Sequence, residues 1–194
     1  MGIEYELKFK ATKEVQSAIL AAVSGEDKAF AMQTTYYDTP TGQLSQRHYT
    51  LRRRMENDIS VCTLKAPAPG GRGEWETECD RIEDSIIMLC KLGAPEILHS
   101  LTQEGLVAVC GARFQRIARI IHLEHCTVEL AIDEGVLTGG SQEVPLCEVE
   151  VELKAGSIDA CNSFAQALAN RFDLQPEKYS KFRRALALYK GECL

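Results

Sequence analysis

The sequence predicts an α+β fold in which a closed barrel of about eight strands has helices packed on its outside. Segments with the alternation of strands recur along the chain and dominate its middle. In several of these segments the charged residues fall on a single face. The predicted helices carry an apolar stripe, which needs an apolar surface to cover it. Helices on the apolar strand faces would turn the charged faces inward.

The first half of the chain is expected to be rich in strands. Residues 3–10 alternate apolar and charged side chains without exception, which predicts a strand. Thr12 can cap a helix that continues to about Val23 and ends near Gly25. Further strands are expected at residues 28–38, 49–55, 59–65 and 73–79, with a Pro/Gly-rich connection at 67–71 before the last of them.

The second half mixes helices with long strands. Short helices are expected at residues 84–92 and 95–103, strands at 113–124, 126–138 and 146–154, and helices at 158–172 and about 178–189. There is no internal repeat, no low-complexity tract and no boundary that would divide the chain. We therefore expect residues 1–194 to form a single domain.

Composition excludes several classes of protein. The net charge of −6 argues against a broad nucleic-acid surface, and no apolar run approaches the length of a membrane span. Without a signal-peptide pattern at its start, the chain is expected to be cytoplasmic. The eight cysteines are scattered and include no CxxC pair, which predicts reduced thiols. The sequence leaves the oligomeric state open, and a homodimer is one alternative.

The charged strand faces are the main clue to chemistry. For any single strand, a face exposed to water is the favoured interpretation. Three carboxylates spaced ~6.7 Å apart repel by roughly 6 kcal/mol at an effective dielectric of ~20, so inside a barrel they need cations. We accordingly expect that removing one such charge relieves repulsion and can raise the stability of the metal-free protein. The single-faced sets are Glu4, Glu6, Lys8 and Lys10; Arg52 and Arg54; Glu74, Glu76 and Glu78; Glu129 and Asp133; and Glu148, Glu150 and Glu152.

The acidic and the basic side chains suit the two parts of one ligand, a metal ion and a phosphate chain. Carboxylates without matching His or Cys favour hard cations such as Mg²⁺ or Mn²⁺. Clustered Arg and Lys favour phosphate oxygens, which the planar guanidinium binds with two donors. Both together indicate a metal-bound polyphosphate. Because no Walker A motif is present, the barrel lining has to hold the phosphates.

The order of the motifs resembles that of the CYTH superfamily, the triphosphate tunnel metalloenzymes. Glu4-Tyr5-Glu6-Leu7-Lys8 is similar to the ExExK signature of that family, and Leu51-Arg52-Arg53-Arg54 to its LRxR element. The resemblance covers nearly the whole chain and is specific in combination. The remaining matches are Tyr36–Pro40, Thr63–Lys65, Arg72 with Glu74, Arg116, Ala131–Asp133 followed by Gly135, Glu148–Glu150, and Ser180–Lys181 with Arg184.

The resemblance implies an eight-stranded antiparallel tunnel, open at both ends, and a set of site residues. The expected metal ligands are Glu4, Glu6, Asp133, Glu148 and Glu150, with Glu74 as a further candidate. The expected triphosphate ligands are Lys8, Arg52, Arg54, Lys65, Arg72, Arg116 and Lys181. Glu4, Glu6 and Lys8 are expected to be catalytic, with Lys8, Tyr36 or Tyr37 as candidates for proton transfer.

The activity that the resemblance implies is metal-dependent hydrolysis of a triphosphate, with inorganic tripolyphosphate as the first candidate and Mg²⁺ or Mn²⁺ as the cofactor. Residues 130–154 and the ending through Tyr189 look like bacterial inorganic triphosphatases. Alternatives on the same fold are a class IV-type adenylate cyclase, a thiamine or nucleoside triphosphatase, and a non-catalytic polyphosphate-binding module. Two departures count against the first two alternatives: only three residues precede ExExK, and Thr50 replaces the aromatic residue of thiamine triphosphatases before LRxR.

Overall fold

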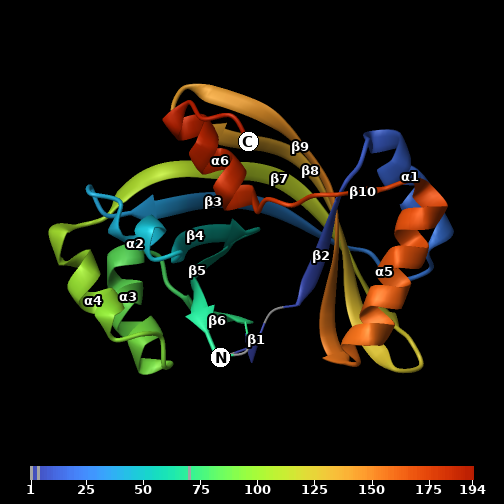
Figure 1. The fold of residues 1–194 in the computed structure, drawn as a ribbon, viewed down its shortest axis with the longest axis horizontal. Helices are drawn as coiled ribbons and strands as arrows, with labels where there is room; N and C mark the ends of the chain where they lie inside the picture. The colour runs from blue at the N-terminus through green and yellow to red at the C-terminus, as the bar shows by residue number, and fades with distance from the viewer. Residues whose placement is uncertain (1, 4, 70) are drawn as a thin grey trace.

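The computed structural model describes residues 2–3, 5–69 and 71–194, and in it one long, curved antiparallel sheet carries helices on both faces (Figure 1). The order of the strands across the sheet is β1-β6-β5-β4-β3-β7-β8-β9-β2-β10. The strands are β1 Gly2–Ile3, β2 Glu6–Lys10, β3 Lys28–Asp38, β4 Thr50–Glu56, β5 Ile59–Ala68, β6 Gly71–Glu78, β7 Val107–His122, β8 Cys126–Gly139, β9 Gln142–Gly156 and β10 Gln175–Pro176. The α+β class and the antiparallel pairing are confirmed.

The sheet formed by these residues is open, so the expected closed barrel of eight strands is not what the structure shows. The predicted first strand is divided between two neighbours: β1 pairs with β6, whereas β2 pairs with β9. The other edge of β2 is occupied by β10, where Gln175 pairs with Lys10 and Pro176 with Phe9. Strand β6 pairs with the preceding Gly2–Ile3, and β2 lies between β9 and β10.

Four helices cover the convex outer face of the sheet, as predicted. Helices α1 (Lys13–Ala22) and α5 (Ile158–Phe172) pack over β2, β8 and β9, with Ile19 and Leu168 in the shared core. Helices α3 (Ile82–Lys91) and α4 (Ile97–Leu101) pack over β4 to β6, where they bury Trp75. The short α2 (Gln43–Gln46) and η1 (Thr102–Glu104) lie in connections. The apolar outward faces of the strands are therefore covered, which leaves the charged faces on the concave side.

Hydroxyl side chains begin three of the helices. The Thr12 hydroxyl accepts a hydrogen bond from the Val15 amide at 3.3 Å, as predicted for the start of α1. Ser157 and Ser180 cap α5 and α6 in the same way. These caps fix where the helices start, and the cap at Ser180 places Lys181 as the first residue of α6.

Helix α6 (Lys181–Lys190) lies on the concave face, so the prediction that the helices pack outside is wrong for α6 (Figure 1). Its apolar side meets inward-facing apolar residues, among them Ala112, Leu137 and Leu146. The contact is close: a Cβ on Gly139 of β8 would lie 2.5 Å from the Ala185 carbonyl oxygen. The inner face of the sheet is apolar at this end and charged elsewhere. Helix α6 consequently fills the apolar end.

Two expectations from composition can be compared with the described residues. All eight cysteines are present as free thiols, and Cys62, Cys110, Cys126 and Cys161 are buried. No helix in the described part of the chain is both long enough and apolar enough to span a membrane.

Candidate functional site

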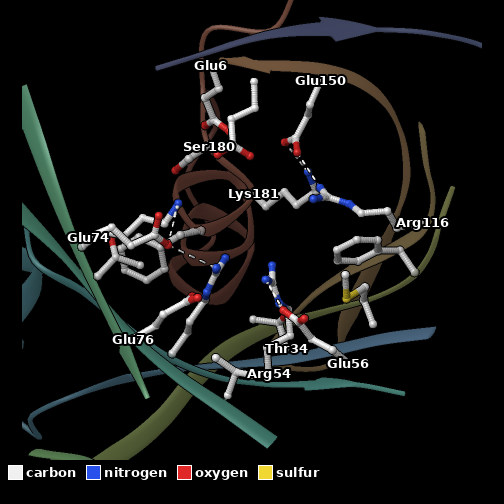
Figure 2. A pocket seen from close by; sticks show the side chains of 18 of the residues that line it. Glu6, Thr34, Arg54, Glu56, Glu74, Glu76, Arg116, Glu150, Ser180 and Lys181 are labelled. Atoms are coloured by element: carbon white, nitrogen blue, oxygen red, sulfur yellow. Dashed lines mark hydrogen bonds and ion pairs between the residues drawn. The ribbon is translucent and has the colours of Figure 1, made fainter. Parts of the chain in front are cut away.

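The concave face of the sheet encloses a cavity of about 470 Å³ beside the start of α6. Side chains from strands far apart in sequence point into a common space, with Arg54 and Glu74 on one side and Arg116 and Glu150 on the other (Figure 2). Most of the lining is charged, and both signs are present. The charged residues are Glu6, Lys8, Arg52, Arg54, Glu56, Lys65, Arg72, Glu74, Glu76, Arg116, Glu129, Glu150, Glu152, Lys154 and Lys181.

Three buried carboxylates form an acidic triad at this site: Asp133, Glu148 and Glu150. Asp133 of β8 stands directly opposite Glu148 of β9, and Glu150 follows on the same face of β9. One oxygen from each of the three lies within 4.8 Å of the others. The alternation predicted for these strands therefore brings three of the expected metal ligands together.

Three cationic side chains neutralise the triad. The Lys181 ammonium lies 2.8 Å from Asp133 Oδ2 and 2.6 Å from Glu150 Oε1, and it also pairs with Glu148. Arg116 binds Asp133 with two donors, Nε and Nη2, each at 2.7 Å. Arg184 pairs with Glu148. Lys181 and Arg116, expected as triphosphate ligands, line the cavity and contact the carboxylates of the triad.

Burial and charge act in opposite directions on these groups. Burial alone would raise the pKa of Glu150, but Lys181 and Arg116 outweigh it and hold that pKa well below its ordinary value. Burial likewise lowers the pKa of Lys181, yet Glu150, Asp133 and Glu148 together bring it above the ordinary value for lysine. For Glu148 burial prevails over Lys181, and its pKa is raised. Lys181 therefore keeps its charge at neutral pH.

The opposite wall, called here the basic wall, carries Arg52 and Arg54 of β4, Lys65 of β5 and Arg72 of β6. Glu56, Glu74 and Glu76 lie among them. Oε1 of Glu74 lies 3.4 Å from the Lys65 ammonium and 3.6 Å from Nη2 of Arg52. Glu74, expected as a further metal ligand, thus lies on the basic wall.

The arginines of this wall are held by neighbouring side chains. Arg54 Nε donates to Glu56 at 2.7 Å and Arg72 Nη2 donates to Thr50 Oγ1 at 2.6 Å. Burial, followed by the charge of Arg52, lowers the pKa of Arg54. Within the described residues, the buried Nε of Arg52 has no hydrogen-bond partner. Crowded guanidinium groups with an unused donor fit a polyanionic ligand.

The N-terminal motif contributes Glu6 and Lys8 to the same cavity. The Lys8 ammonium lies 2.8 Å from Glu6 Oε1. Burial lowers the pKa of Lys8, but Glu6 outweighs this and the pKa is raised, so the side chain carries its proton at neutral pH. Burial also raises the pKa of Tyr36. Glu4 lies outside the described residues, and the catalytic roles of Glu4, Glu6 and Lys8 remain predictions.

Two residues not identified from the sequence, Gln16 and Glu177, support the triad together with Arg184, a motif match. Gln16 of α1 donates through Nε2 to the backbone oxygens of Asp133, at 2.9 Å, and Glu148, at 3.0 Å. Arg184, to which the motif match assigned no role, shares the inner face of α6 with Lys181 three residues earlier. Glu177 is buried and accepts a hydrogen bond from Arg184 at 3.4 Å. Gln16 could have been noticed in the sequence, because it is a polar residue within the apolar stripe of α1.

The Gln16→Leu variant is expected to lose about 2 kcal/mol of unfolding free energy, because two buried carbonyl oxygens lose their donor. Urea denaturation measures the loss. The matched control is Ser17→Ala, since Ser17 is exposed on the same helix and bonds only within its own turn. A Gln16→Leu variant as stable as Ser17→Ala would show that the two hydrogen bonds contribute nothing.

The donor set of the triad fits a hard divalent cation. It provides oxygen ligands, without His or Cys, on rigid neighbouring strands. Among the described residues, the group of three does not extend to Glu6, which pairs with Lys8. Of the predicted metal ligands, Asp133, Glu148 and Glu150 thus lie together.

Comparison with known proteins agrees with this geometry. The chain matches the family model of the CYTH domain over residues 2–186. It is 26% identical over 166 residues to an inorganic triphosphatase of Haemophilus influenzae. That alignment covers 84% of this chain and 47% of the relative, so the chain spans about half the length of the curated protein it matches.

Solved structures share the fold at lower identity. HpAC1 of Hippeastrum, a protein described as having a dominant triphosphatase activity, superposes with a TM-score of 0.69 at 18% identity, covering 99% of this chain and 98% of the other. The PH1819 protein of Pyrococcus horikoshii gives a TM-score of 0.61 at 20% identity, covering 96% and 99%. These similarities establish the arrangement of strands and helices around the cavity.

Proposed function

This chain belongs to the CYTH domain family, and on that premise we propose that it is a metal-dependent triphosphatase that cleaves inorganic tripolyphosphate to diphosphate and phosphate. The observation that carries the proposal is one cavity that Glu150 of the acidic triad lines on one side and the arginines of β4 and β6 line on the other, with Asp133 and Glu148 buried beside Glu150. The relative named inorganic triphosphatase supports the choice of substrate.

The acidic triad and the glutamates of the N-terminal motif are assigned to the metal. Asp133, Glu148 and Glu150, with Glu6 and Glu4 of the N-terminal motif, would hold Mg²⁺ or Mn²⁺ through carboxylate oxygens. When bound, the ion supplies charge neutralisation of the phosphates and activation of water. The triad, buried on two neighbouring strands, holds its oxygens in place before a ligand arrives.

The basic wall is assigned to the substrate. Arg52, Arg54, Lys65 and Arg72 would bind phosphate oxygens from one side of the cavity, with Lys8, Arg116 and Lys181 on the other. Protonated Lys8 suits the stabilisation of negative charge on the departing diphosphate. Direct attack by water on the terminal phosphate would need no covalent protein intermediate.

Phosphate release from tripolyphosphate with Mg²⁺ or Mn²⁺ tests the proposal. We expect release with either metal and none after chelation with EDTA. Parallel reactions with ATP and thiamine triphosphate, followed by chromatography for cyclic AMP, identify the cyclase and nucleotide alternatives. Tripolyphosphate that binds in calorimetry without being hydrolysed, at any pH from neutral to alkaline, would leave a binding module and refute the triphosphatase.

Arg54→Ala is expected to raise the KM for tripolyphosphate about 10- to 100-fold and to change kcat by less than about threefold, because charged hydrogen bonds to phosphate form in both the ground and transition states. Steady-state phosphate release measures both constants. Arg53→Ala is the matched control: Arg53 faces the opposite side of β4, where its Nε donates to Ser60 Oγ at 2.9 Å. Equal KM values for the two variants would remove Arg54 from the substrate site.

A further inference from the structure

The Lys181 ammonium contacts the same three carboxylates that the proposed function assigns to the metal. Its nitrogen lies 2.8 Å from Asp133 Oδ2 and 2.6 Å from Glu150 Oε1, and it pairs with Glu148 Oε2. A single positive charge is thus already placed at the centre of the triad. A lysine that served phosphate alone would have no reason to contact all three groups.

Simultaneous binding of a metal ion and this ammonium to the triad is electrostatically unfavourable. An ion bonded at about 2.1 Å to an oxygen that also contacts the ammonium at 2.8 Å or less lies within about 5 Å of the nitrogen. Both charges would then be buried, where repulsion between like charges is poorly screened. Binding of the metal therefore favours departure of the ammonium.

Of the three cations that contact the triad, Lys181 is the one whose side chain can move away most easily. Arg116 is fixed to Asp133 by two parallel hydrogen bonds, and Arg184 is tied to Glu177 as well as to Glu148. Lys181 is held by its ammonium, with Phe114 beside it at 5.4 Å from the ring centroid. Its flexible four-carbon stem starts at the first residue of α6 and lines the cavity, so its charge can swing into that space.

We propose that Lys181 is an exchangeable internal cation, which occupies the triad in the metal-free protein and is released into the cavity when a divalent metal binds. The inference rests on the proposed function, because it takes the triad as the metal site. Release adds one free ammonium to the space that receives the phosphates. Metal binding thereby prepares the cavity for its anionic substrate, and each ligand favours the other.

The test uses metal alone, without any phosphate. Mn²⁺ is titrated calorimetrically into the wild-type protein and the Lys181→Met variant, in which the competing charge is absent. We expect the variant to bind Mn²⁺ at least about tenfold more tightly. Lys154→Met is the matched control, since it removes another cavity lysine, which pairs with Glu152 at 2.9 Å and does not contact the triad. Its expected change is below about threefold.

A second measurement needs no variant that removes the charge. In protein labelled with ¹⁵N-lysine, the Lys181 ammonium signal, assigned by its absence in Lys181→Arg, should shift as Mg²⁺ saturates the protein. Equal Mn²⁺ affinity in wild type and Lys181→Met, weaker binding in that variant, equal tightening in Lys154→Met, or an unmoved Lys181 signal would overturn the exchange. Because no hydrolysis is measured, these results leave the proposed function intact, whereas wild-type protein without phosphate release refutes only that function.

Discussion

In the Glu150→Gln variant, metal-dependent release of phosphate from tripolyphosphate is expected to fall at least about 1,000-fold. The substitution keeps the shape of the side chain and removes one of three clustered ligand charges, so the site loses several kcal/mol of the stabilisation that a bound cation supplies. Initial rates at saturating Mn²⁺ measure the loss.

The same variant is expected to be less stable by about 3 kcal/mol without metal, as measured by urea denaturation. Glu150 pairs with Lys181 and Arg116, so the amide removes one carboxylate from two buried cations, which keep Asp133 as a charged partner. From the sequence alone, removing one carboxylate from the row is expected to stabilise the protein, because only the repulsion between the carboxylates can be recognised. The structure adds the cations, and with them the sign reverses.

Glu152→Gln is the matched control for both measurements. Glu152 is the next residue on the same face of β9, but it lies outside the triad and pairs with Lys154 at 2.9 Å. We expect less than about a tenfold loss of activity and less than about 1 kcal/mol of stability. Equal losses in the two variants would mean that position within the triad does not matter.

Replacing Arg116 with methionine is expected to lower the unfolding free energy by about 4 kcal/mol in metal-free protein. The guanidinium holds Asp133 with two hydrogen bonds and also pairs with Glu150, and Asp133 is fully buried. Its loss leaves the buried carboxylates of Asp133 and Glu150 with Lys181 as their shared cation. Urea denaturation in EDTA measures the effect.

Added Mn²⁺ should restore part of the stability of Arg116→Met, because a bound cation replaces the missing charge; at a hundred times its Kd the gain is about 2.7 kcal/mol. Arg113→Met is the control on the same strand: Arg113 is exposed and pairs with Glu143, so a change below about 0.5 kcal/mol is expected. A similar loss in both variants, or no response to metal, would contradict the role assigned to Arg116.

Local patterns in the sequence were sufficient for most of the fold. The alternation in β9 placed Glu148 and Glu150 on one face, and Thr12 marked the start of α1. The start of β7 at Val107 was missed, since Val109 to Ala112 are all buried and show no alternation. Each of these features depends on near neighbours in the chain.

Features that depend on distant pairing were not predictable in this way. An apolar stripe on α6 gives no sign of which sheet face it will meet, and it packs inside because Ala112, Leu137 and Leu146 make that end apolar. Likewise, the N-terminal motif does not reveal that β10 would take one edge of β2. The partners of the triad follow from the position of α6, which explains why Lys181 was expected among the phosphate ligands only.

A crystal structure with Mn²⁺ and tripolyphosphate, with manganese located in an anomalous difference map, tests the account most directly. We predict a manganese peak about 2.1 Å from oxygens of Asp133, Glu148 and Glu150, with phosphate groups facing Arg52 and Arg54. Manganese and tripolyphosphate bound outside the cavity, with Lys181 still on the three carboxylates, would contradict it.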